Sequence, residues 1–216
     1  MKKVVLINTV KPVTLSFEKK LKERMPDLDV SNILDEHIAK ELNKKDGFEE
    51  EDYMRLLALI KLAESTKPDL ILATCSSLSM AIEELKQFIS VPIYKIDENM
   101  LTMAVESDKK ITILATADST IGPTKSHLES IARDKAKDIN VEYKVVGPAY
   151  EAMKQGDIEL HDKMLLEEAS NLKDAELIIL AQASMSHLQE RMEELCKCQV
   201  LSSINSAVDL IVEVLS

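Results

Sequence analysis

Short apolar runs rich in β-branched residues alternate along the whole chain with longer stretches whose apolar residues recur at helical spacing. The apolar runs predict strands, and the clearest are residues 4–10, 69–75, 111–117 and 176–182. The longer stretches, such as residues 49–65, predict amphipathic helices. Continuous apolar strands that alternate with helices are typical of a parallel sheet covered by helices on both faces. The sequence therefore predicts an α/β protein.

The remaining segments continue the same pattern to the end of the chain. Further strands are predicted over residues 29–34, 91–96, 141–147 and 199–204. Further helices are predicted over residues 14–25, 79–88, 99–106, 120–137, 161–172, 185–195 and 207–215.

The two halves of the chain resemble each other. Residues 2–9 align with residues 109–116, and residues 69–76 align with the segment from Glu176 onward when the offset grows by one. In that register Cys75 aligns with Ala183 and Ser76 with Ser184. Any two α/β halves share some likeness, but matching spacing over four elements favours a true duplication.

The repeat predicts two pseudo-symmetric, Rossmann-like lobes, each with a mostly parallel four-stranded sheet. The first lobe would comprise residues 1–97 plus 206–216, and the second residues 98–205. Since ligands of open α/β sheets bind at the carboxyl ends of the strands, we expect a ligand cleft between the lobes.

The segments that follow the predicted strands are rich in hydroxyl and amide side chains and precede predicted helices. Free backbone N–H groups at a helix start, together with hydroxyls, suit a carboxylate, although simple helix capping explains any one hydroxyl equally well. We expect a small carboxylate or dicarboxylate to be bound by residues at these strand ends, namely Asn8, Thr9, Ser76, Ser77, Thr116, Thr120, Ala183 and Ser184.

Cys75 is the candidate for acid–base or nucleophilic chemistry, because it lies between a buried strand and a helix, as reactive cysteines often do. The alternative is a small buried apolar side chain, the commonest role of a free cysteine. Cys196 and Cys198 form a CxC pair without a second pair or a nearby histidine, so no metal is expected. The four histidines are scattered, and His187 is expected to face solvent.

Composition excludes several classes of function. The chain has 27 Lys and Arg against 38 Asp and Glu, a formal net charge of −11, which argues against nucleic acid and anionic membrane as partners. Only 4 glycines are present, and neither common phosphate-binding loop occurs, so no nucleotide cofactor is expected. Without an expected secretory signal or membrane span, we predict a cytoplasmic protein. The expected partner is a small-molecule carboxylate, and a homodimer stays open.

The doubled α/β plan, with ATCSS at residues 73–77 and LAQASM at 180–185, resembles the Asp/Glu/hydantoin racemase superfamily. The segments VPIYKIDENM (91–100) and ILATADSTIGPT (113–124) are also similar to that family. The resemblance implies a cofactor-independent isomerase in which two cysteines act on opposite faces of a carbon next to a carboxylate. One removes the proton and the other returns it, while nearby hydroxyls and N–H groups hold the carboxylate.

The chain departs from that pattern, because Cys75 matches the first cysteine but the second falls on Ala183 in the aligned register. A methyl group cannot exchange a proton, so Cys75 would act alone, and Ala183→Cys would restore racemisation. The alternatives are a single-cysteine decarboxylase or isomerase, and a non-catalytic protein that binds small carboxylates.

Overall fold

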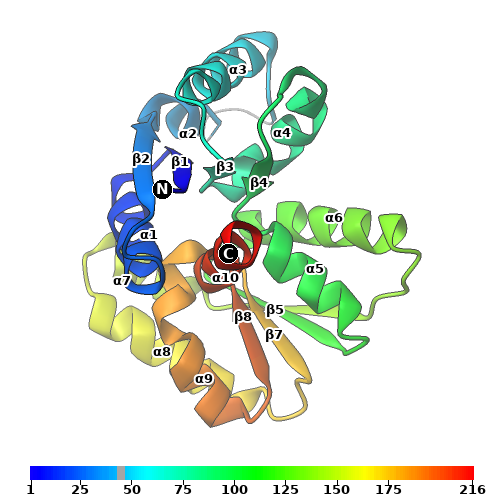
Figure 1. Cartoon of the computed structure of the whole chain (residues 1–216). Helices are drawn as coiled ribbons and strands as arrows, with labels where there is room; N and C mark the ends of the chain where they lie inside the picture. Colours follow the sequence, from blue (N-terminus) through cyan, green and yellow to red (C-terminus); the bar gives the residue numbers. More distant parts are fainter. Residues whose placement is uncertain (43–46) are drawn as a thin grey trace. The chain divides into compact units, whose positions relative to one another are not determined.

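The computed structural model describes residues 1–42 and 47–216 and divides into two compact units. Unit 1 comprises residues 1–96 and 207–216, and unit 2 comprises residues 97–206. Each unit has a four-stranded, wholly parallel sheet with helices packed against it, which confirms the predicted α/β class (Figure 1).

The sheet of unit 1 has the strand order β2-β1-β3-β4. Its strands are β1 (Lys3–Asn8), β2 (Asp29–Leu34), β3 (Leu70–Ala73) and β4 (Ile93–Lys95). Its helical segments are α1 (Lys11–Arg24), α2 (Glu36–Leu42), α3 (Glu50–Ser65), η1 (Ser76–Leu78), α4 (Ser79–Leu85) and η2 (Lys86–Phe88). The η segments are short 3₁₀ turns.

The sheet of unit 2 repeats this order as β6-β5-β7-β8. Its strands are β5 (Ile111–Ala115), β6 (Val141–Val145), β7 (Leu177–Leu180) and β8 (Gln199–Ser202). Its helical segments are α5 (Glu98–Glu106), α6 (Asp118–Asp134), α7 (Gly147–Lys154), α8 (Ile158–Asn171), η3 (Ala183–Leu188) and α9 (Gln189–Cys196). Helix α10 (Ser203–Leu215) begins in unit 2 and continues into unit 1.

Alternation along the strands builds a core on each face of the unit 2 sheet. Ile111, Ile113 and Ala115 pack with apolar residues of α5 and α6, whereas Leu114 packs with residues of α8 and α9 on the other face. This follows from the period of two in a strand, which sends successive side chains to opposite faces. Both faces are apolar because helices cover both, which explains the unbroken apolar runs in the sequence.

The hydrogen-bond registers of the two sheets show that the repeat has one constant offset. Val4 pairs with Leu70 as Ile111 pairs with Leu177, and every equivalent position lies 107 residues further along the chain. The pairing of Ile71 with Ile93 likewise matches that of Ile178 with Val200.

Polar contacts at the strand starts obey the same offset. The backbone N–H of Lys3 donates to the Asp69 carboxylate at 2.8 Å, and that of Lys110 donates to the Glu176 carboxylate at 2.6 Å.

The one-residue increase in offset expected from the sequence is therefore wrong. Cys75 corresponds to Gln182, and Ser76 corresponds to Ala183. Both Cys75 and Gln182 have extended backbones, with φ/ψ of −129°/117° and −131°/135°, immediately before a 3₁₀ turn. The expected match rested on the shared Leu-Ala pair at 72–73 and 180–181, which the ladder places in different registers.

Two helices, α2 and α7, were not predicted. Only Ile38 of α2 is buried, and α7 begins with Gly-Pro and buries only Ala149 and Ala152, so neither gives a strong apolar pattern. Among the residues that the structure describes, no helix is both long and apolar enough to span a membrane.

Candidate functional site

The carboxyl end of the unit 1 sheet contains a hydrogen-bond network centred on the buried side chain of Asn8. The hydroxyl of Thr74 donates to Asn8 Oδ1 at 2.7 Å, and Asn8 Nδ2 donates to Asn32 Oδ1 at 3.1 Å. Asn8 is fully buried, so its amide ties the ends of β1, β2 and β3 together. Its direct contact with a ligand stays a prediction.

Thr9, the next residue, is also buried, with 2 % of its surface exposed. Its hydroxyl has no hydrogen-bond partner among residues 1–42 and 47–216. A buried hydroxyl without a partner is costly, because its desolvation is not compensated. The described protein atoms therefore leave the Thr9 hydroxyl without a hydrogen bond.

Cys75 lies two residues beyond Ala73, the last residue of β3, and immediately before the turn η1. The thiol residue is half-buried, and Ser76 and Ser77 beside it are exposed. The structure thus places one thiol and two hydroxyls together at the carboxyl end of a central strand, as predicted from the sequence.

The other two cysteines occupy an environment that disfavours the thiolate. Burial raises the pKa of Cys196, whose thiol donates to Met192 O at 2.6 Å. Burial, together with the neighbouring Cys196, raises the pKa of Cys198 to about 12. Since the thiolate is the reactive form, these two residues are unsuited to acid–base chemistry near neutrality.

An ion pair that sequence reasoning missed lies at the end of β2. Arg55 Nε on α3 donates to Asp35 Oδ2 at 2.5 Å, and Asp35 Oδ1 accepts from the backbone N–H of His37 at 2.9 Å. Burial alone would raise the pKa of Asp35, but the hydrogen bonds from Arg55 and His37 outweigh it and hold the pKa below its ordinary value. Asp35 and Arg55 lie 20 residues apart in the sequence, and no short sequence pattern predicts that they pair.

Asp35→Asn is expected to lower the free energy of unfolding at pH 7 by about 1 kcal/mol, because Arg55 is half exposed and solvent weakens the pair. The folded-state pKa lies below the ordinary value, so the stabilisation is complete above about pH 4 and is lost as the pH falls further. Urea unfolding at pH 7 and pH 3 would measure this. Asp27→Asn, at an exposed position, is the control, and an equal loss at both pH values would contradict the assignment.

The carboxyl end of the unit 2 sheet is organised around Thr116 and Gln182. Thr116 is 1 % exposed, and its backbone N–H and its hydroxyl both donate to Gln182 Oε1, at 2.7 and 2.9 Å. Thr116 and Thr9 are equivalent in the repeat. The glutamine thus supplies in unit 2 the acceptor that the described residues of unit 1 do not offer to Thr9.

The other predicted residues of unit 2 lie near this pair along the chain. Thr120 is half-buried in the first turn of α6, Ala183 is half-buried at the start of η3, and Ser184 is exposed beside it. They occupy the segments that directly follow β5 and β7, and their contact with a ligand stays a prediction.

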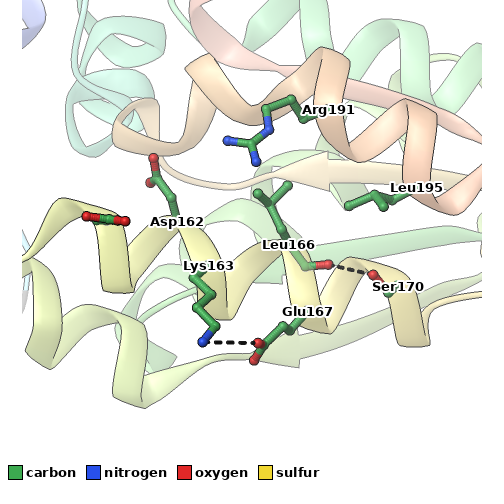
Figure 2. A pocket seen from close by; sticks show the side chains of 8 residues that line it. Asp162, Lys163, Leu166, Glu167, Ser170, Arg191 and Leu195 are labelled. Carbon is green, nitrogen blue, oxygen red and sulfur yellow. Dashed lines mark hydrogen bonds and ion pairs between the residues drawn. The ribbon is translucent and has the colours of Figure 1, made fainter.

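A shallow groove of about 520 Å³ lies elsewhere in unit 2, between α8 and α9 (Figure 2). Its lining is largely charged, and it includes an ion pair of Lys163 with Glu167 at 3.9 Å. None of the predicted site residues lines it. The groove is therefore no candidate for the predicted carboxylate site.

Asp162, at the edge of that groove, connects two histidines that the sequence leaves apart. Its carboxylate lies 2.7 Å from His161 Nδ1 and 2.8 Å from His187 Nε2. The side chain of His187 is half exposed, in keeping with the predicted solvent-facing position. Within the described ranges, no group of three or more His, Cys, Asp or Glu side chains is arranged to hold a metal ion.

Comparison with known proteins identifies the family to which the chain is similar. Residues 4–211 match the profile of the family described as Asp/Glu/Hydantoin racemase. No curated protein matches the sequence.

Solved structures of similar fold come from several racemases. The chain resembles an aspartate racemase from Picrophilus torridus with a TM-score of 0.75 at 18 % identity, over 99 % of this chain and 94 % of that one. For the allantoin racemase from Klebsiella pneumoniae the TM-score is 0.73 at 15 % identity, over 100 % of this chain and 87 % of that one. The glutamate racemase from Aquifex pyrophilus gives a TM-score of 0.62 at 17 % identity, over 98 % of this chain and 83 % of that one.

Proposed function

The chain belongs to the Asp/Glu/hydantoin racemase family, and from this premise we propose that it acts without a cofactor on a carbon next to a carboxylate. Family membership supports an isomerase-type enzyme. The observation that carries the proposal is Cys75, a half-buried thiol beside two exposed serines at the carboxyl end of β3. The substrate class we propose is an amino acid or a dicarboxylate.

In the proposed reaction Cys75 is both acid and base. Its thiolate removes the proton from the α-carbon, and the electron pair of the broken C–H bond moves into the carboxylate to give an enediolate. The thiol then returns a proton, or a deuteron from solvent, to the same carbon and becomes a thiolate again. Because one group acts from one side, exchange with solvent is expected with retention of configuration. Net turnover would come from an isomerisation or decarboxylation that passes through the same enediolate.

The carboxylate would be held by the predicted strand-end residues. The donors in unit 1 that best support this are exposed Ser76 and Ser77 and the hydroxyl of Thr9, which has no hydrogen-bond partner among the described residues. Preorganised donors that strengthen as the enediolate forms are commonly the largest catalytic contribution. In unit 2 the proposed contacts come from the hydroxyls of Thr120 and Ser184 and from the backbone of Ala183, since both donors of Thr116 are bonded to Gln182.

The test of the function is solvent-deuterium exchange into a panel of aspartate, glutamate, hydantoins and malonates in D₂O. Loss of the α-proton signal without loss of optical purity would support one-sided proton transfer. Exchange accompanied by release of CO₂ would indicate a decarboxylase. Binding without any exchange would favour a non-catalytic carboxylate-binding protein, the alternative that the lack of a thiol at position 182 also favours.

Ligand binding itself should be visible as stabilisation. A carboxylate of the substrate class at 100 times its dissociation constant is expected to stabilise the protein by about 2.7 kcal/mol. A thermal-shift screen of amino acids, hydantoins and dicarboxylates measures this, with chloride at equal ionic strength as the control. A shift with a nucleotide and with no carboxylate would contradict the proposed ligand class.

A further inference from the structure

The hydrogen bonds from Thr116 determine which end of the Gln182 carboxamide faces Thr116. Two donors of Thr116, its backbone N–H and its hydroxyl, converge on one atom of the Gln182 carboxamide. A backbone N–H can only donate, so the atom 2.7 Å from it must be the carbonyl oxygen and not the amide nitrogen. Nε2 is therefore the other terminal atom of the carboxamide.

Both N–H groups of Nε2 remain available for another acceptor, because Thr116 bonds only to the oxygen of the carboxamide. Gln182 is half-buried, and in the described part of the chain no residue accepts a hydrogen bond from Nε2. The arrangement leaves a neutral donor, held in one orientation, at the carboxyl end of β7. It occupies the position that Cys75 occupies in unit 1.

We propose that Gln182 binds an oxygen of the ligand carboxylate through Nε2, while its Oε1 holds Thr116 in place, and that it transfers no proton. This rests on the proposed function for the identity of the ligand. A carboxamide is neither an acid nor a base near neutrality, so the residue in the second position of the repeat serves binding. Proton transfer then belongs to unit 1 alone.

The direct test is the side-chain amide signal of Gln182 in the ¹H–¹⁵N NMR spectrum of the intact protein, identified by its loss in Gln182→Glu. On titration with malonate, aspartate or glutamate, this pair of signals is expected to shift saturably. Gln199, at the amino-terminal end of β8, is the internal control, since its Oε1 is also anchored, by Lys109 at 3.1 Å. Its signals should stay in place.

Two variants separate binding from support of the fold. Gln182→Glu keeps an oxygen acceptor for Thr116 but removes the donor, so affinity for the same carboxylates should fall about tenfold or more, with little change in melting temperature. Gln182→Met removes donor and acceptor, so both affinity and melting temperature should fall. Gln199→Glu adds the same charge and should leave affinity unchanged.

The outcomes distinguish this inference from the proposed function. Gln182 signals that do not move with any of the three carboxylates, or a Gln182→Glu variant of unchanged affinity, would overturn the inference even if exchange at Cys75 is observed. Signals that move while no exchange occurs would support Gln182 as a binding residue and contradict the enzymatic role of Cys75.

Discussion

Replacing Cys75 with alanine is expected to lower the rate of solvent-deuterium exchange at the α-carbon by about 10²- to 10⁴-fold, the usual worth of one positioned acid–base group. Cys75→Ser should lose nearly as much, because a hydroxyl without an activating base is too weak an acid or base near neutrality. The loss of the α-proton signal in D₂O, followed by NMR for wild type and both variants, measures the effect.

Cys198→Ala is the matched control for this experiment. The thiol of Cys198 is half-buried like that of Cys75, but burial and the neighbouring Cys196 raise its pKa to about 12. It therefore holds almost no thiolate at neutral pH, and its removal should leave exchange unchanged. Exchange that survives Cys75→Ala would remove this residue from the mechanism.

The parts of the fold that the sequence predicts well are those whose signal is local. Continuous apolar runs such as residues 111–117 mark strands covered on both faces, and the observed β5 lies within that run. The same reasoning shortens or misses elements with a weak apolar pattern. Helix α7 is an example, because its first residues, Gly147 and Pro148, are typical of turns and only two small alanines are buried.

The candidate site could be located from the sequence but not detailed. Placing Cys75, Ser76 and Thr116 at strand ends needs only the strand boundaries and the rule for open α/β sheets. The bond between Thr116 and Gln182 joins residues 66 apart, as does the bond between Asn8 and Thr74, and neither has a sequence signature. Such contacts are set by the register of neighbouring strands, which single-residue patterns do not fix.

The same limit explains the error in the repeat. The shared residue types favoured pairing Leu72-Ala73 with Leu180-Ala181. In the sheets, however, Leu72 pairs with Leu6, and Ile179 pairs with Ile113, the equivalent of Leu6, so Leu72 corresponds to Ile179. A slip of one residue in the hydrogen-bond register would turn every side chain of a strand to the opposite face of the sheet. The register therefore decides which residues of the two buried sheets are equivalent. The experiment to restore a second thiol therefore belongs at Gln182 and not at Ala183.

Gln182→Cys is expected to create or raise racemisation of aspartate or glutamate by about 10²- to 10⁴-fold over wild type. The resemblance to the family implies a second thiol that acts on the opposite face of the α-carbon, and position 182 repeats the local backbone of Cys75. With an acid on one side and a base on the other, a proton removed from one face can be replaced on the other. Polarimetry or chiral chromatography of the product measures the change.

The substitution should also destabilise the fold. Buried Thr116 loses the acceptor of two hydrogen bonds, and an unsatisfied buried donor costs about 1–3 kcal/mol. The substitution also removes the Nε2 donor proposed to bind the carboxylate. Activity is therefore best compared at saturating substrate and at a temperature where circular dichroism shows both proteins folded.

Ala183→Cys is the matched control, because it adds the same thiol one residue further along the chain. Position 183 corresponds to Ser76, which follows the reacting residue, so its thiol would be displaced by one residue from the acid–base position. Racemisation should therefore appear in Gln182→Cys and stay at the wild-type level in Ala183→Cys. The reverse result would show that the strand register does not set the site. Brisk racemisation by wild type would mean that a residue other than a cysteine already serves the second face.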